Sequence, residues 1–390
     1  MASKRLMRKK LALFMAMRAK PYFCEVEYLQ GDGNQYIQIS GLTLDTNIAI
    51  RSFMKPISAT NGADVNWFGT GTTASSNDAI SGLIRNDITT SGGFCRFLGK
   101  LFTYDNHPTP FGKKYDCYYS ADSATCDGFN FPSTDTASGS VSLPLTIFKN
   151  INSTATGTIQ LFSYRIWNLQ TGFSLLDLIP VLDWNMRPAM YDKVSRQMFY
   201  NQGTGEFAVG RQIHPLEYIE STGRQVILTG ITGEARWVGT AQSTARSSRS
   251  QIIIGAASLT AKFLASQIGS GGTVWGLSSY AGAYTTVGTT EKATFDVNFT
   301  NSLTTATINN QYVSYSASAP FEQEFCVFNR GSNYYFTGKL WELKGYQNNE
   351  LVRDYIPARD ENNVGVLFDK VTHGIFDNSG SGSFICGDDL

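Results

Sequence analysis

Acidic side chains at alternate positions are the first candidates for chemistry in this chain. Glycoside hydrolysis needs two carboxylates that face one cleft, and sandwich-type glucanases place them on one strand as Glu-x-Asp-x-x-Glu or Glu-x-Asp-x-Glu. Glu25-x-Glu27 and Glu322-x-Glu324 have the alternation, but both lack the third acid. Two acids at this spacing are typical of a solvated strand face. We therefore predict no hydrolase site and no enzymatic activity.

Metal ligands and nucleophiles are the next candidates. The three histidines are scattered without the spacing of zinc ligands, and the chain has no GxSxG motif, Walker loop or Cys-His signature. The run Asp360–Asn363 offers the hard oxygen atoms that calcium prefers, although a polar turn is the interpretation that we favour. We predict no metal site and no cofactor, with calcium at this run as the alternative.

The six cysteines do not have the spacing of a disulfide framework. Cys117 and Cys126 are the one near pair and could close a small loop in an oxidising compartment. The alternative is buried thiols in a protein made in the cytosol, which is the interpretation that we favour.

Tryptophans are the candidates for ligand binding. Sugars bind to exposed aromatic faces that lie beside amide and carboxylate groups. Trp67 and Trp184 stand in loop-like or strand-end segments. If any aromatic side chain contacts ligand, these two are the first candidates, although burial in a core is the interpretation that we favour.

Residues 1–20 form a basic segment with an apolar side. They contain seven basic side chains and no acid, and Pro21 follows. This pattern predicts a short amphipathic helix that anchors the chain, and it leaves the rest of the chain with an excess of acids. Docking into a partner protein is favoured over an anionic membrane or packaged nucleic acid, and a frayed terminus is the alternative. The anchoring residues are Lys4, Arg5, Arg8, Lys9, Leu11, Phe14 and Met17.

The elements that must position these residues occur twice. Residues 167–207 and 341–384 share a tryptophan, Asp-x-Ile-Pro, aromatic-Asp-Lys-Val and Gly-x-Gly-x-Phe in the same order. This match predicts an internal duplication with a basic arm at 1–20, a first domain at 21–210 and a second at 211–390. Shared residues most simply preserve a fold, so we expect turn-forming roles for Asp192 and Asp369 and core positions for the two tryptophans, Trp167 and Trp341.

Composition predicts the fold class. Aromatic residues make up 13% of the chain and there are 37 glycines, which favours many short strands joined by tight turns. The 32 basic and 32 acidic residues balance, so the whole chain offers no electrostatic case for nucleic acid. Asn309-Asn310 predicts a tight hairpin, and residues 60–80 and 120–141 have the composition of long loops. We expect an all-β chain of two tandem antiparallel β-sandwich domains of jelly-roll type, preceded by a short basic N-terminal helix.

The second copy resembles a known family at both of its ends. Its opening Leu216-Glu217-Tyr218-Ile219-Glu220-Ser221-Thr222-Gly223 and its closing residues 339–384 are similar to those of concanavalin A-like, laminin-G-like jelly-roll modules. Such modules occur in proteins of bacteriophages and prophages and in surface proteins of their hosts. The resemblance implies two curved antiparallel sheets used for adhesion or virion building, and it brings no catalytic residues.

These observations together predict a phage virion protein: a decoration, fibre or receptor-binding component that displays two lectin-like domains. Its partners would be other virion proteins, reached through residues 1–20, and a host-cell glycan. We expect it to be multi-copy, made in the host cytoplasm and exposed on the virion. The alternative is a bacterial surface or secreted carbohydrate-binding adhesin, in which residues 1–20 are cleaved or membrane-bound.

Overall fold

The computed structural model describes residues 23–59, 64–70, 80–85, 93–103, 109–142, 144–149, 156–244, 251–256, 263–269, 272–278, 284–289, 292–316, 323–329 and 335–390. The predicted arm, residues 1–20, lies outside this part of the chain. Contacts divide the chain into two compact units, Met1–Gly210 and Arg211–Leu390.

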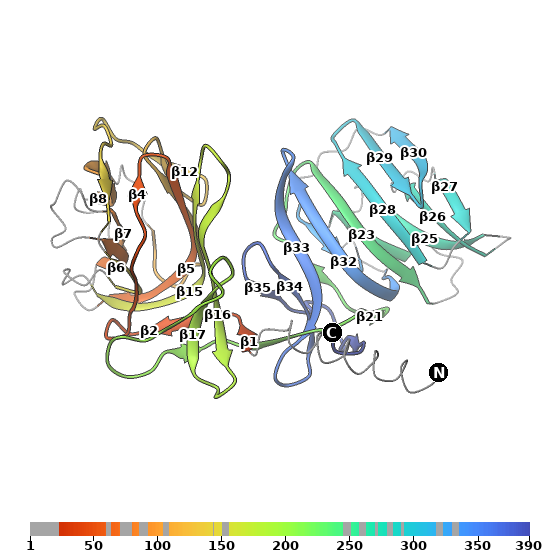
Figure 1. Cartoon of the computed structure of the whole chain (residues 1–390). Coiled ribbons are helices and arrows are strands. Elements are labelled where there is room, and N and C mark those ends of the chain that lie inside the picture. Colours follow the sequence, from red (N-terminus) through yellow and green to blue (C-terminus); the bar gives the residue numbers. More distant parts are fainter. Residues whose placement is uncertain are drawn as a thin grey trace, which may run out of the picture. The chain divides into compact units, whose positions relative to one another are not determined.

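Both units are built from β-strands, and the described residues contain no helix (Figure 1). No described segment therefore has the long apolar helix that would be needed to cross a bilayer. Within each unit the named strands pair antiparallel. The predicted all-β fold class with antiparallel sheets is confirmed.

The strands of the first unit are β1 (Phe23–Val26), β2 (Leu29–Gly31), β3 (Ile37–Ile39), β4 (Leu44–Asp45), β5 (Ile48–Ala59), β6 (Asp64–Thr70), β7 (Ile80–Arg85), β8 (Gly93–Phe97), β9 (Lys100–Thr103), β10 (Tyr115–Ser120), β11 (Ala124–Cys126), β12 (Phe129–Phe131), β13 (Ser140–Val141), β14 (Leu145–Ile147), β15 (Gly157–Asn168), β16 (Ser174–Asp183), β17 (Pro188–Asp192), β18 (Met198–Tyr200) and β19 (Ala208–Val209).

The strands of the second unit are β20 (Gln212–Pro215), β21 (Ile219–Thr222), β22 (Ile227–Leu228), β23 (Ala235–Ser243), β24 (Gln251–Ala256), β25 (Phe263–Gly269), β26 (Gly272–Ser278), β27 (Tyr284–Thr289), β28 (Lys292–Phe299), β29 (Leu303–Ile308), β30 (Gln311–Ser316), β31 (Phe325–Val327), β32 (Thr337–Gln347), β33 (Glu350–Arg359), β34 (Gly365–Asp369), β35 (Gly374–Phe376) and β36 (Ile385–Cys386).

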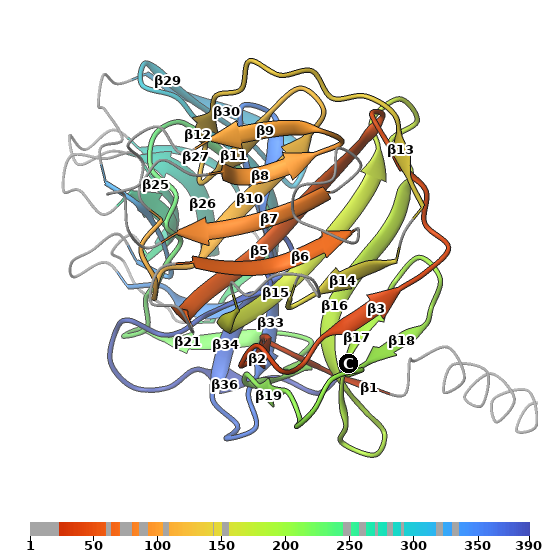
Figure 2. The same cartoon turned by 90° about the vertical axis from the view of Figure 1, so that its left-hand side faces the viewer.

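The two units repeat one strand order. In the larger sheet, β12-β11-β10-β5-β15 of the first unit corresponds to β30-β29-β28-β23-β32 of the second. In the other sheet, β3-β14-β6-β7-β8-β9 corresponds to β22-β31-β24-β25-β26-β27 (Figure 2 shows the first of these). Beyond the larger sheets, β16-β17-β18 corresponds to β33-β34-β35. The small sheet β4–β13 belongs to the first unit alone.

An apolar core lies between the two sheets of each unit. In the first unit Trp67 of β6 and Tyr119 of β10 meet at 5.9 Å between ring centroids. In the second unit Trp237 of β23 and Phe325 of β31 meet at 5.7 Å. These rings come from opposite sheets, so burying their apolar surface holds the sheets together.

The long loops predicted at 60–80 and 120–141 are wrong for the described residues. Strand β6 lies in the first segment, and β11, β12 and β13 lie in the second. Alternate side chains in β11, Ala124 and Cys126, are buried, and pairing with β10 satisfies the backbone despite the polar composition.

The structure also describes the predicted Asn309-Asn310 hairpin and the pair of nearby cysteines. Asn309 and Asn310 both have positive φ and close the β29–β30 hairpin, which confirms the prediction. Cys117 and Cys126 are buried free thiols whose sulfur atoms lie 3.2 Å apart. Burial raises the pKa of the Cys117 thiol well above its usual value.

Candidate functional site

The turn between β16 and β17 is fixed by one buried carboxylate. Asp183 Oδ1 accepts hydrogen bonds from the N–H groups of Asn185 (2.8 Å) and Arg187 (3.0 Å). Asp183 Oδ2 accepts from Arg187 Nε and from the Tyr200 hydroxyl, both at 3.0 Å. These bonds hold the turn residues Trp184 and Met186 outward on a rigid base.

The same hydrogen bonds set the charge of the carboxylate. Burial acts to raise the pKa of Asp183, but the donors of Arg187, Tyr200 and Asn185 outweigh it and lower the pKa below its usual value. Hydrogen bonding to Asp183 raises the pKa of Arg187, so both groups stay ionised at neutral pH. The turn is therefore held by a charge-assisted network.

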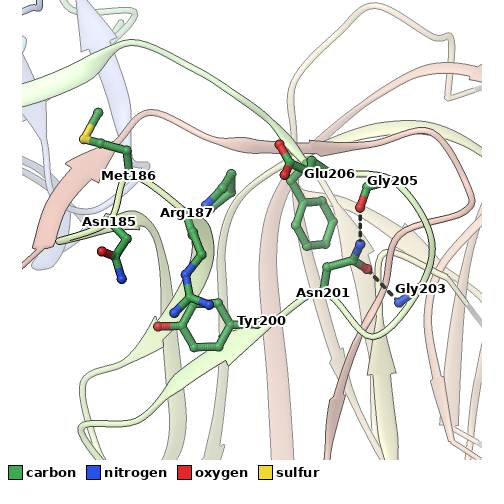
Figure 3. Close-up of a pocket in the computed structure, with 10 residues that line it drawn as sticks. Asn185, Met186, Arg187, Tyr200, Asn201, Gly203, Gly205 and Glu206 are labelled. Carbon is green, nitrogen blue, oxygen red and sulfur yellow. Dashed lines mark hydrogen bonds between the residues drawn. The ribbon is translucent and has the colours of Figure 1, made fainter.

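Arg187 and Tyr200 form one side of a pocket. The guanidinium of Arg187 lies 4.6 Å from the centroid of the Tyr200 ring, a cation–π geometry (Figure 3). Because Asp183 binds both side chains, their orientation is set before any ligand arrives. The pair presents an aromatic edge and a planar cation to the pocket.

Asn201 and two glycines form the other side. Asn201 Nδ2 donates to the carbonyl of Gly205 at 2.8 Å, and Asn201 Oδ1 accepts from the N–H of Gly203 at 2.8 Å and of Tyr36 at 3.1 Å (Figure 3). A Cβ at Gly203 would lie 1.9 Å from the carbonyl oxygen of Asn34, and Gly205 has a φ of +74°. Glycine is therefore required in this wall, as the repeated Gly-x-Gly predicted.

The cavity between these sides has a volume of about 480 Å³, within the range of small-molecule sites. The side chains of Glu206 and Asn185 have no hydrogen-bond partner among the described residues. At the turn, Trp184 is 76% exposed and Met186 is 58% exposed. The lining residues are Asn185, Met186, Arg187, Pro188, Tyr200, Asn201, Gly203, Gly205, Glu206 and Phe207.

The side chains of this site are suited to hydrogen bonding and to contact with an apolar face. Glu206 can accept hydrogen bonds from hydroxyl groups, Asn185 can donate and accept, and the Trp184 ring offers an apolar face. Asp183, the buried carboxylate nearby, is already the acceptor of several protein hydrogen bonds. A pair of carboxylates free to act on one glycosidic bond is not presented here.

Of the two tryptophan candidates, only Trp184 lies on the turn that contributes Asn185 and Met186 to the cavity, and Trp184 itself is not among the lining residues. Trp67 is 1% exposed, and its Nε1 donates to the Ser52 hydroxyl at 3.3 Å inside the first core. Its ring fills the space between the sheets, so Trp67 is removed as a ligand-binding candidate and has the buried position that was favoured for it. Arg187 and Tyr200 were not among the residues predicted from the sequence. The sequence difference between the two copies could have pointed to Tyr200, because the matched residue in the second copy is Asp377.

The matched aspartates have the turn-forming roles predicted for them. Asp192 Oδ1 accepts from the N–H groups of Asp177 (2.8 Å) and Val194 (3.1 Å). Asp369 Oδ1 accepts from the equivalent N–H groups of Asp354 (2.8 Å) and Val371 (3.1 Å).

The matched tryptophans differ from the prediction. Trp167 and Trp341 are half-buried and belong to neither core, because their neighbours Ile166 and Leu340 take the inward positions and alternation turns the tryptophans outward.

The remaining candidates lie elsewhere. Asp360 Oδ1 accepts from the N–H groups of Asn362 and Val364, both at 2.9 Å, and Glu361 accepts from the N–H of Gln212 at 2.9 Å, so this run forms a polar turn. The described residues contain no cluster of three or more His, Cys, Asp or Glu suited to a metal ion. The predicted anchoring residues of the arm lie outside the described residues.

Comparison with known proteins adds a distant likeness. No protein-family profile matches the sequence, and no curated protein matches it. The chain is similar to the solved structure of mouse laminin alpha1 chain domains LG4-5, with 14% identity, 95% of this chain and 98% of that chain covered, and a TM-score of 0.29.

It is also similar to the LG1-3 region of the laminin alpha2 chain, with 13% identity, 84% of this chain and 63% of that chain covered, and a TM-score of 0.28. TM-scores of this size carry no inference about function. What the chain's own strands establish is an all-β protein of antiparallel sheets.

Proposed function

We propose that this chain is a non-enzymatic adhesion protein whose first unit binds a glycan at the β16–β17 turn. The observation that carries the proposal is the pocket itself. The turn that carries the exposed Trp184 ring also lines a cavity of about 480 Å³, and the Glu206 carboxylate and the Asn185 amide in that lining have no hydrogen-bond partner among the described residues. Sugars combine apolar ring faces with hydroxyl groups, and this set of side chains is complementary to both.

The wider role proposed is display on a virion, with residues 1–20 as the anchor. What supports it is the basic, apolar-faced composition of those residues. A bacterial surface or secreted adhesin is the second candidate. Purified particles distinguish them: full-length protein should sediment with virions and a chain lacking residues 1–20 should not. Binding of both proteins to whole bacteria but not to particles would favour the adhesin.

The glycan proposal is tested with a matched pair of variants. A glycan array identifies the neutral oligosaccharide that the full chain binds best, and isothermal titration then measures its Kd. Trp184→Ala should weaken binding about tenfold or more, because stacking of a ring on an aromatic face is lost. Phe173→Ala is the control, since Phe173 is 74% exposed on the β15–β16 turn. Equal affinities for wild type and Trp184→Ala would show that the glycan does not bind at the β16–β17 turn.

A further inference from the structure

The outward tryptophans of the two larger sheets form a second kind of surface. Trp167 of β15 and Trp341 of β32 occupy matched positions in the repeat and face away from the cores. The inward neighbours Ile166 and Leu340 are fully buried. A large ring retained in both copies without a place in either core calls for an explanation other than packing between the sheets.

Each tryptophan packs against a tyrosine in the same way. Trp167 and Tyr118 have centroids 5.9 Å apart and an interplanar angle of 52°, and Trp341 and Tyr218 have 5.8 Å and 52°. The tyrosines are not equivalent. Tyr28 is the match of Tyr218, and it packs against Phe162 instead. The same aromatic pair is thus built from different positions, which shared ancestry alone does not account for.

Two cations accompany the pair in the first unit. The guanidinium of Arg165 lies 5.4 Å from the Trp167 centroid, and Arg51 stands directly opposite Arg165 on the next strand. Like charges opposite one another are unfavourable in a sheet. Asp116 pairs with Arg51 through bonds of 2.8 and 2.6 Å, whereas the one acceptor of Arg165 among the described residues is the neutral hydroxyl of Ser174.

The acid on the other side of Arg165 is also engaged. Asp177 stands opposite Arg165 on β16, and its carboxylate pairs with Lys193 at 3.2 Å. Arg165 therefore keeps an uncompensated charge beside an aromatic face.

The second unit also has two cations beside its aromatic pair, although only one of them matches a cation of the first unit. Lys292 lies 3.9 Å from the Trp341 centroid, and Lys339, the match of Arg165, lies 3.9 Å from the Tyr218 centroid. Neither lysine forms an ion pair with a described residue. Glu220 stands opposite Lys339, and its carboxylate accepts from the Thr244 hydroxyl at 2.9 Å. The Tyr218 hydroxyl, followed by the charges of Glu220 and Glu217, raises the pKa of Lys339, so this lysine stays protonated.

We propose that this outward face binds an acidic sugar in each unit, with the pyranose ring stacked on the tryptophan and the sugar carboxylate held by the adjoining cations. Lysine and arginine have long flexible stems, so the cations can move from the rings to the ligand. A polymer of such residues could engage both units and gain avidity. The proposal rests on the glycan-binding role above but concerns a different surface, and polygalacturonate is its probe.

The test uses the full chain with polygalacturonate, neutral dextran and single-stranded DNA, measured by biolayer interferometry at two salt concentrations. We expect polygalacturonate to bind and the double variant Trp167→Ala/Trp341→Ala to weaken it at least tenfold. Arg165→Gln/Lys292→Gln, which changes only exposed side chains, should weaken it similarly and reduce the salt dependence. Thermal unfolding checks that both variants fold.

Three outcomes overturn the proposal. The first is unchanged polygalacturonate binding in the charge variant, and the second is equal binding of dextran. The third is equally tight binding of DNA, which would indicate non-selective attraction of anions or a nucleic-acid surface. The variant Trp184→Ala separates the two glycan proposals. If it abolishes neutral-oligosaccharide binding but leaves polygalacturonate binding intact, the sites are distinct. If the chain binds polygalacturonate but no neutral oligosaccharide, the proposal for the pocket is contradicted and the proposal for the outward face is supported.

Discussion

The β16–β17 turn of the first unit and the β33–β34 turn of the second share one backbone conformation but carry different side chains. Asp183 and Asp360 each accept hydrogen bonds from the N–H groups two and four residues ahead. The third turn residue has a positive φ in both, 62° at Met186 and 60° at Asn363. The frame of the turn is therefore independent of what it displays.

The walls behind the two turns agree in the same way. Asn378 repeats the bonds of Asn201, donating to the carbonyl of Gly382 at 2.7 Å and accepting from the N–H of Gly380 at 2.8 Å. A Cβ at Gly380 would lie 2.2 Å from a backbone carbonyl oxygen, that of Arg224. Both copies thus keep the residues that no other side chain can replace.

The displayed side chains differ completely. Glu361 replaces Trp184, and Asp377 replaces Tyr200 and pairs with Arg211 through bonds of 2.6 and 2.9 Å. Arg359 donates to Asn363 within the second turn. The second turn is thus closed on itself by polar contacts, whereas the first leaves an aromatic ring and a cavity. A duplicated frame has been kept while the side chains that it displays have diverged.

The largest effect should follow from damage to the shared frame. Gly203→Ala places a methyl group against the carbonyl of Asn34, and we expect it to lower the free energy of unfolding by about 3 kcal/mol. Gly172→Ala is the comparison variant: Gly172 has a φ of +73° and no atom lies within 4 Å of the added Cβ, so only backbone strain of about 1 kcal/mol is expected. Urea unfolding measures both. Equal losses would show that close approach is not what fixes glycine in this wall.

Exchange of the displayed residues should have the next largest effect. Trp184→Glu with Tyr200→Asp gives the first turn the side chains of the second, and the loss of aromatic contacts should cost about 2 kcal/mol of glycan affinity, or roughly 30-fold in Kd. The fold should persist, since the backbone bonds of Asp183 and Asn201 remain. Titration with the array-selected oligosaccharide measures this. Retained affinity would mean that the difference between the turns is unrelated to binding.

The smallest effect concerns pH. Because the pKa of Asp183 is lowered on folding, its contribution to stability is present above the unfolded value of about 3.9 and is lost as pH falls through the lower folded value. Asp183→Asn should cost about 1 kcal/mol at neutral pH and should lose less stability than wild type on acidification.

Chemical unfolding at several pH values between 2 and 7 measures this change. Asp360→Asn shows whether the second turn behaves alike. A variant whose stability fell as steeply with acid as that of the wild type would contradict the assignment of this pH dependence to Asp183.

The frame could be predicted from the sequence better than the site. Gly-x-Gly, Asp192 and Asp369 recur because the backbone requires them, and recurrence is visible in one chain. Burial was harder to predict. Trp67 lies in a polar segment but is buried, whereas Trp167 lies in an apolar segment but faces outward. Strand pairing decides which face each ring occupies, and composition does not encode that pairing. Tyr200 was missed because its role depends on Asp183, which is distant along the chain and adjacent only after folding.

Hydrogen–deuterium exchange with the array-selected oligosaccharide tests the central claim most directly. The first unit should show protection in 184–188 and 200–207, the residues of the turn and its facing wall. The matched residues 361–365 and 377–384 of the second unit should exchange as in the free protein. Protection of the second set, or of neither, would contradict the assignment of glycan binding to the first turn.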